Sequence, residues 1–180
     1  MILTVSGEVG AGKSTVARAL AQSLGLRYLS SGEIFRGEAR RRGVTLAALG
    51  RLAENDPSID RMIDQAQVAE ARGGDIVLES RLSGWLVDGD VRIWLRAPVE
   101  VRARRVAARD GLTLDAARAD IENRESSERR RYAALYQIDL SDLTRYHVVL
   151  DTSVWGADEI TQAIAGLARA LRGARSGRRA

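Results

Sequence analysis

The sequence predicts an α/β fold in which a parallel five-stranded sheet carries helices on both faces. Short apolar runs of strand length alternate with longer stretches of helical apolar spacing. The 180 residues are 45% hydrophobic, which suits one buried core rather than two comfortable domains. A glycine-rich loop joins the first strand to the first helix, where such sheets collect ligands. We therefore expect residues 1–172 to form a single domain, followed by a disordered basic tail at 173–180.

The apolar and β-branched runs predict five strands, at residues 1–5, 27–29, 75–79, 91–95 and 146–150. Helical spacing predicts further helices at about 14–24, 97–109, 114–135 and 157–171. Residues 31–72 are predicted to form three helical segments, inserted between two strands of the sheet. Ser30-Ser31-Gly32 is suited to capping the first piece, and Pro57 to the first turn of the third.

The chain is organised around the loop after the first strand, which fits the pattern G-x-x-x-x-G-K-[ST] at every fixed position. Its residues are Gly7, Glu8, Val9, Gly10, Ala11, Gly12, Lys13, Ser14 and Thr15. Glycines let successive backbone N–H groups turn inward onto phosphate oxygens, and the helix that follows adds its positive dipole end. With its strand and helix in place, this loop predicts the P-loop NTPase fold and a site for the phosphates of a nucleoside triphosphate.

Polar side chains at the predicted strand ends complete this candidate site. Lys13 is the only lysine among 28 basic residues and can reach the β- and γ-phosphates. The Ser14 hydroxyl is a candidate Mg²⁺ ligand, and Glu79, which ends the third strand, is a candidate for a water-mediated contact to Mg²⁺. Arg81 follows that strand, and the segment 151–153 follows the fifth.

Composition excludes several other classes of site. With no cysteine and a single histidine, the chain has neither disulfides nor a histidine cluster for zinc. The net charge of +4 arises from 28 basic and 24 interspersed acidic residues, which does not favour nucleic acid as a partner. The loop begins at residue 7, which leaves no room for a signal peptide, and no apolar run reaches the length of a membrane span. We expect a cytoplasmic monomer.

Several further motifs resemble those of the nucleoside monophosphate kinases, and most closely the short archaeal-type cytidylate kinases. Besides the loop, the resemblance covers Ser31-Gly-Glu-Ile-Phe-Arg36, Leu52-Ala-Glu-Asn-Asp-Pro57, Glu79-Ser-Arg-Leu82, Arg124-Glu-x-x-Glu128-x-x-Arg131-Tyr132 and Tyr136-Gln-Ile-Asp139. It extends over nearly the whole chain to about residue 172. Two positions depart from the family pattern, because Ser80 and Gln137 stand where glycine is usual.

The resemblance implies a role for each matching residue. It implies that residues 31–72 form a mobile acceptor-binding lobe and that residues 110–125 form a lid. The implied catalytic residues are Lys13, Arg81, Arg124 and Arg131. The implied acceptor-binding residues are Ser31, Gly32, Phe35, Arg36, Arg81 and Glu128. Asp151 and Ser153 match the neighbourhood of the family's adenine pocket. For the base of the acceptor, Glu54, Asp60 and Glu128 remain alternative acidic partners, together with Arg81.

The implied reaction is transfer of the γ-phosphoryl group from ATP to CMP or dCMP, with Mg²⁺ as the metal. The planar guanidinium group of arginine can bind two phosphate oxygens at once, which suits this reaction. The acceptor phosphate is already ionised and attacks directly, so we assign no general base. The alternatives are an adenylate or shikimate kinase, a GTP-dependent switch and a nucleic-acid binder. A GTP-dependent switch would need an Asn-Lys-x-Asp motif to recognise guanine. The chain cannot contain this motif, because its only lysine is at position 13.

Overall fold

The computed structural model describes residues 1–177 and contains a five-stranded sheet in the order β2-β3-β1-β4-β5. Its strands are β1 (Ile2–Gly7), β2 (Arg27–Ser30), β3 (Ile76–Glu79), β4 (Val91–Arg96) and β5 (Val148–Asp151). All four neighbouring pairs are parallel, which confirms the predicted sheet.

The register aligns the polar strand ends at one edge of the sheet. Glu79 of β3 lies beside Val5 of β1 and Ser30 of β2. On the other side of β1, Gly7 lies beside Leu95 of β4. Because the carboxyl ends of parallel strands share an edge, the glycine-rich loop and Glu79 are brought together there.

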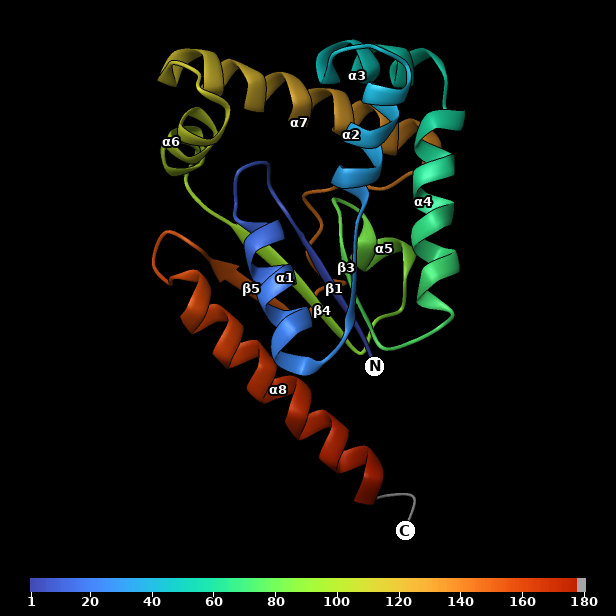
Figure 1. Ribbon diagram of the computed structural model, residues 1–180, viewed down its shortest axis with the longest axis vertical. Coiled ribbons are helices and arrows are strands. Elements are labelled where there is room, and N and C mark those ends of the chain that lie inside the picture. Colours follow the sequence, from blue (N-terminus) through green and yellow to red (C-terminus); the bar gives the residue numbers. More distant parts are fainter. Residues whose placement is uncertain (178–180) are drawn as a thin grey trace.

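Helices cover both faces of the sheet (Figure 1). Leu3 and Val5 of β1 point into a core formed with α1 (Lys13–Leu24) and α8 (Ala157–Gly177). Ile2 points to the opposite face, where a smaller core includes residues of α4 (Ser58–Ala71) and α5 (Ser83–Leu86). This alternation along β1 is the period-2 pattern of a strand buried on both faces.

Two helical additions stand above the carboxyl edge of the sheet. The first contains α2 (Ser31–Arg41), α3 (Leu46–Asn55) and α4, which share an apolar core of their own. The second pairs α6 (Val99–Asp110) with α7 (Leu114–Tyr136), and the loop residue Val9 packs into its core. In Figure 1, α7 runs across the top of the molecule from α6 to α3 and α4, over the glycine-rich loop.

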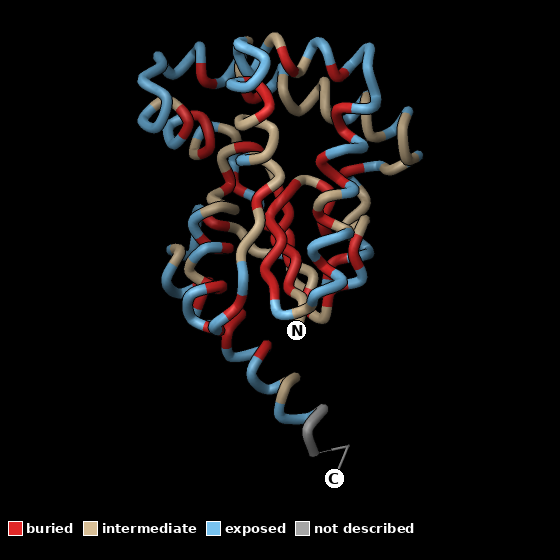
Figure 2. Tube along the Cα trace, turned by 45° about the vertical axis from the view of Figure 1, so that its right-hand side comes forward, coloured by how far each residue is buried: buried red, intermediate tan, exposed pale blue. Residues whose placement is uncertain are grey.

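The structure differs from the predicted elements at three places. The four-residue helix α5 was not predicted, and β5 begins at Val148 rather than at residue 146. Helix α8 continues to Gly177 rather than ending near residue 171, so it extends into the predicted tail, of which residues 178–180 lie outside the described residues. Figure 2 shows alternating buried and exposed positions along the part of α8 that crosses the sheet. Within residues 1–177, the model contains no helix with the length and apolar character of a membrane span.

Candidate active site

The glycine-rich loop adopts backbone angles that its glycines make accessible. Gly10 and Gly12 have φ angles of 78° and 83°, in the left-handed region that β-carbons disfavour. At Gly7 the restriction is steric, because a β-carbon there would collide with the carbonyl oxygen of Leu95. Helix α1 begins at Lys13, so its unpaired N–H groups are directed at the loop. The loop therefore has the geometry of a phosphate cradle, as predicted.

Lys13 lies in the cradle with its charge partly destabilised. Its Nζ donates a hydrogen bond of 2.7 Å to the carbonyl oxygen of Glu8. Loss of hydration, reinforced by the positive charge of Arg81, lowers the pKa of Lys13 to about 8, although Glu79 acts in the opposite direction. An ammonium that has lost water in this way gains strongly from an anionic partner such as a polyphosphate.

Ser14 and Glu79 supply oxygen ligands of the kind that Mg²⁺ prefers. Ser14 lies in the first turn of α1, next to Lys13. Glu79 is 5% exposed, and its Oε2 accepts hydrogen bonds from the hydroxyl groups of Tyr28, at 3.3 Å, and Ser30. Residues 1–177 contain no group of three or more candidate metal-binding side chains. This donor set fits Mg²⁺, which usually retains water and phosphate ligands.

Arg81 connects the cradle to α7. Its NH1 donates to the carbonyl oxygen of Gly7, and its Nε donates to Oε2 of Glu128 at 2.6 Å. Although burial disfavours the charged form of Arg81, Glu128 and Glu125 raise its pKa. Arg81 is therefore charged at the mouth of the cradle, where the resemblance places it.

Arg124 lies on the same side of α7 as Glu128. Its NH1 is 3.4 Å from Oδ2 of Asp120, one turn earlier on the helix. Burial works against the charged form of Glu128, but Arg81, Arg124 and Lys13 outweigh it and lower the pKa of this carboxyl. The charges of these three predicted cations thus act together on one carboxylate, which Arg81 contacts directly.

Arg131, two turns further along α7, lies at the acceptor lobe rather than at the cradle. Its NH1 is 2.5 and 2.6 Å from the two carboxylate oxygens of Asp60 in α4. The Phe35 ring of α2 lies 6.0 Å from the centre of its guanidinium. Of the alternatives for an acidic partner of the base, Asp60 is therefore placed with Arg131, and Glu128 with Arg81.

The remaining acceptor-side residues lie at the start of α2. The Ser30 hydroxyl caps this helix by accepting a hydrogen bond from the backbone of Glu33, and Ser31 Oγ donates to the carbonyl oxygen of Glu79 at 3.4 Å. Gly32 is in the first turn, and a β-carbon there would lie 3.4 Å from NH1 of Arg36. In the described part of the chain, no carboxylate oxygen lies within 4 Å of the Arg36 guanidinium. Arg36 thus forms no direct ion pair with a described residue, although its charge adds to that of Arg109 in lowering the pKa of the Asp110 carboxyl.

The loop after β5 is held by an arginine of α6. Asp151 and Ser153 hydrogen-bond each other, with Oδ1 of Asp151 accepting from the backbone N and the hydroxyl of Ser153 at 2.9 and 2.6 Å. Between them, Thr152 accepts from both NH1 and NH2 of Arg105, at 2.7 Å each. The predicted donor-side residues therefore form a tight turn, and Arg105 fixes its position.

Sequence reasoning missed the roles of Arg102 and Glu125 beneath the cradle. Arg102 is 6% exposed and donates to the carbonyl oxygen of Val9 at 3.0 Å and to Glu125 at 2.9 Å. Its Nε is 3.2 Å from the carboxylate of Glu8. A signal was present, because Arg102 shares the apolar face of α6 with Val106, one turn later.

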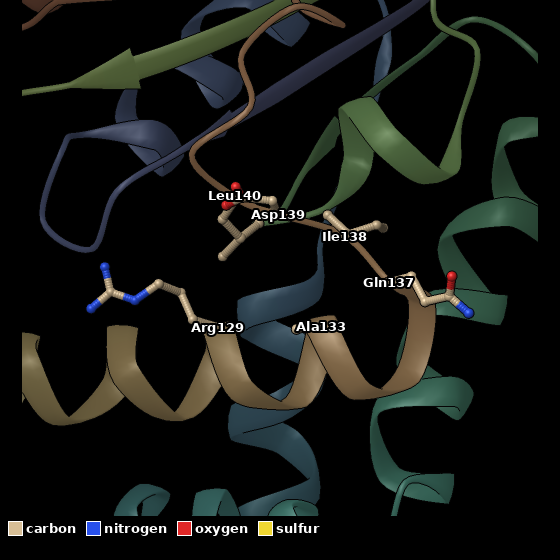
Figure 3. A pocket seen from close by; sticks show the side chains of 6 residues that line it. All are labelled: Arg129, Ala133, Gln137, Ile138, Asp139 and Leu140. Atoms are coloured by element: carbon tan, nitrogen blue, oxygen red, sulfur yellow. The ribbon is translucent and has the colours of Figure 1, made fainter.

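The two departures from the family pattern have local explanations. Ser80 is buried, and its Oγ accepts a hydrogen bond of 3.0 Å from the backbone of Leu82. Gln137 follows the last residue of α7 with a φ angle of 58°, the left-handed conformation in which glycine is usually found. Gln137 and Arg129 both line a hollow of about 300 Å³. Figure 3 shows their side chains at opposite ends of the group of lining residues, pointing away from each other. This hollow contains none of the cradle residues.

Comparison of the sequence with known proteins points to one family. The model of the "Cytidylate kinase-like family" matches residues 2–154. A cytidylate kinase from Halobacterium salinarum is 49% identical over 167 residues, which cover 91% of this chain and 87% of the relative. One from Pyrococcus furiosus is 44% identical over 161 residues, covering 89% and 84% of the two chains.

Solved structures are similar in fold. Shikimate kinase from Acinetobacter baumannii, in complex with shikimate, has a TM-score of 0.60 at 19% identity over 94% of this chain and 93% of its own. An uncharacterized protein from Eubacterium ventriosum has a TM-score of 0.68 at 15% identity, covering 93% and 97%. These structures confirm the predicted P-loop NTPase fold. With the match of the family model and the identity to curated relatives, the chain belongs to the cytidylate kinase-like family.

Proposed function

We propose that the protein transfers the γ-phosphoryl group of ATP to CMP or dCMP, giving ADP and CDP or dCDP. It is an ATP-dependent nucleoside monophosphate kinase, the enzyme class of its relatives, and its small-molecule partners are the two nucleotides. The observation that supports the reaction most strongly is that the charges of Lys13, Arg81 and Arg124 all act on the Glu128 carboxylate, while Arg81 also binds the cradle carbonyl of Gly7. This arrangement is suited to two phosphate chains that meet end to end.

The chemistry requires positive charge and alignment more than covalent participation by the protein. In phosphoryl transfer, charge is spread over the equatorial oxygens of the transferred group, between the attacking and leaving oxygens. The cradle amides and Lys13 would hold the donor phosphates, while Arg36 would hold the acceptor phosphate. Arg81 and Arg124 would stabilise the transferred group from the side.

Magnesium, when bound with ATP, would neutralise charge on the donor phosphates, with Ser14 as a ligand and Glu79 acting through water. The Tyr28 and Ser30 hydroxyl groups keep the Glu79 carboxylate oriented at the end of β3. Such a supported carboxylate is suited to holding an outer-sphere water in one place. The acceptor phosphate is already ionised, so no general base is needed.

Closure of α7 would exclude water from this reaction. We propose that residues 110–125 act as the lid and residues 31–72 as the acceptor lobe, as the family resemblance implies. In the structure, α7 already touches both sides, because Glu128 binds Arg81 and Arg131 binds Asp60. A closed lid prevents hydrolysis of the donor by water.

A coupled assay of ADP release tests the proposed function. The acceptors are CMP, dCMP, UMP, AMP, dTMP and shikimate, each with ATP and Mg²⁺. We expect CMP or dCMP to give the highest kcat/KM. Equal rates on all nucleotides, or a preference for AMP or shikimate, would overturn the assignment to cytidylate while leaving the phosphate-transfer site in place.

A further inference from the structure

We propose that Asp60 and Arg131 read the base of the acceptor nucleotide, with the carboxylate accepting from the exocyclic amine of cytosine and the guanidinium donating to its ring. This inference rests on the proposed function and assigns the specificity of that site to one pair of residues. It gives Arg131 a base-reading role in place of the catalytic role that the family resemblance implies. It also selects one of the acidic partners that the sequence leaves open.

A polar row on the buried face of α4 first points to this pair. Asp60, Asp64 and Gln67 lie on that face at spacings of four and three residues, and they are 5%, 8% and 0% exposed. The same face contributes Ile59 and Ile63 to the apolar core of the lobe. Burial of two carboxylates and an amide side by side is unfavourable unless they have partners. Gln67 donates to Asp64 at 3.1 Å, and Asp60 is paired with the guanidinium of Arg131.

The geometry of the pair leaves donors available. Only NH1 of Arg131 contacts Asp60, at 2.5 and 2.6 Å from its two oxygens, instead of the two-pronged pairing that a guanidinium allows. The Nε of Arg131 is buried and has no hydrogen-bond partner among the described residues. A buried donor left unpaired is costly, and a ligand that accepts from this guanidinium would relieve the cost.

The other acidic candidates are occupied elsewhere. Glu54 pairs with Arg130 at 2.8 Å, and the side chain of Arg130 is 62% exposed. Glu128 pairs with Arg81, which reaches the carbonyl oxygen of Gly7 in the phosphate cradle. Glu128 therefore belongs to the phosphate end of the site. Asp60 lies beyond it, on the lobe side of α7.

The pair matches cytosine and opposes uracil. Asp60 and Arg131 together present an acceptor followed by donors, and the pairing edge of cytosine presents a donor, its amine, followed by two acceptors, N3 and O2. Uracil has a carbonyl oxygen in place of the amine and an N–H at N3. It would set acceptor against acceptor and donor against donor, which rejects a ligand more strongly than a missing contact does.

Neighbouring side chains can hold the ring and the pair in position. The Phe35 and Tyr132 rings lie 6.0 and 5.5 Å from the centre of the Arg131 guanidinium, and Phe35 is also an expected acceptor-binding residue. Asp64, one turn after Asp60, accepts from the Tyr136 hydroxyl at 2.8 Å. Asp64 therefore joins α4 to the end of α7, and among residues 1–177 it forms no ion pair. We assign it a structural role in this contact and no part in reading the base.

The test is a cycle that alters the protein and the ligand together. Wild type and Asp60→Asn are assayed with CMP, with UMP and with the 5′-monophosphate of pyrimidin-2-one riboside, which lacks the exocyclic amine. In wild type we expect kcat/KM for CMP to exceed that for the amine-free analogue by roughly tenfold or more. In Asp60→Asn the carboxamide can turn its NH₂ towards the base, so the preference for CMP over the analogue and over UMP should fall by roughly tenfold or more.

Asp64→Asn is the matched control. It makes the same change one turn later on the same helix face, and we expect it to leave the ratio of CMP to analogue unchanged even if the protein is less stable. Ratios from one preparation cancel any difference in the fraction of active enzyme. If Asp60→Asn does not fold, the double variant Asp60→Asn/Arg131→Gln removes both buried charges together and should lose the same preference.

The outcomes separate this inference from the proposed function. If wild type prefers CMP and Asp60→Asn keeps the full preference for the amine, the base is read elsewhere and the inference is wrong, while the function stands. If Asp64→Asn loses the preference as fully as Asp60→Asn, the effect belongs to the helix and not to this pair. If wild type does not prefer CMP over the other nucleotides, the proposed function itself fails.

Discussion

The backbone N–H of Val9, in the phosphate cradle, donates a hydrogen bond of 3.0 Å to Oε1 of Glu125 in α7. The same oxygen is 2.9 Å from NH1 of Arg102 and 3.6 Å from NH2 of Arg81. Glu125 thus places a carboxylate against a cradle amide and two arginines, which are the groups that phosphate oxygens seek. The lid helix and a bound polyphosphate are expected to compete for this position.

The first prediction follows from that competition. Glu125→Gln removes a negative charge near the incoming phosphates while keeping the size of the side chain, so we expect ATP to bind roughly tenfold more tightly. Isothermal titration with ATP in the absence of acceptor measures the change. Glu122→Gln, an exposed residue three positions earlier on α7, is the matched control and should leave the affinity unchanged. Weaker or unaltered ATP binding by Glu125→Gln would show that the carboxylate supports the cradle rather than competing with phosphate.

The second prediction concerns the single lysine. Lys13→Ala should lower kcat by about 10² to 10³-fold, because the ammonium stabilises charge that develops in the transition state. The fold should survive, because loss of hydration already lowers the pKa of this group and its removal leaves no unpaired ion. Turnover and the thermal midpoint are measured on the same preparation. Unchanged turnover would remove Lys13 from the mechanism, and a collapse of the midpoint would make its role structural.

The third prediction is a pH dependence with a fixed sign. Lys13 has a pKa of about 8, so it is charged below that pH and loses its proton as the pH rises. The value of kcat/KM for ATP, which reports the free enzyme, should therefore fall along an alkaline limb near pH 8. Lys13→Arg keeps its charge throughout this range, so whatever activity it retains should lack the limb. A wild-type profile that stays flat well above pH 8 would contradict the prediction.

The cradle could be predicted from the sequence because its determinants are local. Gly7, Gly10, Gly12 and Lys13 lie within seven residues, between a strand and a helix that their own apolar spacing identifies. The order of the sheet adds only the placement of Glu79 beside Val5, which follows from the parallel arrangement. Short-range backbone requirements and period-2 patterning together determined this part of the site.

The acceptor side could be predicted only in outline. The Arg131–Asp60 pair joins residues 71 positions apart, and Val9 and Glu125 are 116 positions apart. The hydrophobic periodicity of the sequence does not indicate which of the 27 arginines pairs with which carboxylate. That pairing depends on how α7 crosses the lobe and the cradle. Helix α5 was missed for a different reason, since its four residues are too few to show helical spacing.

The fourth prediction separates the two nucleotide sites. Arg36→Ala should raise the KM for the acceptor by roughly ten- to a hundredfold with a smaller change in the KM for ATP, since a charged hydrogen bond to phosphate is lost. Arg40→Ala, an exposed arginine one turn later on α2, is the control and should behave as wild type. Steady-state kinetics with each substrate varied in turn provides both constants. An effect confined to ATP would assign Arg36 to the donor side.

The fifth prediction concerns the end of the lid helix. Gln137 has a φ angle of 58°, where a residue with a β-carbon is strained, and its backbone N–H closes the last turn of α7 by donating to Ala133 at 3.0 Å. Gln137→Gly relieves that strain and should raise the free energy of unfolding by about 1 kcal/mol, which corresponds to roughly 2–4 °C in thermal midpoint for a chain of this size. Gln137→Ala keeps the β-carbon and is the control, expected to show no gain. Because α7 carries Arg124, Glu128 and Arg131, a firmer end to this helix should stabilise the protein while leaving kcat near its wild-type value. Calorimetry that finds Gln137→Gly no more stable than Gln137→Ala would show that the left-handed turn is not strained.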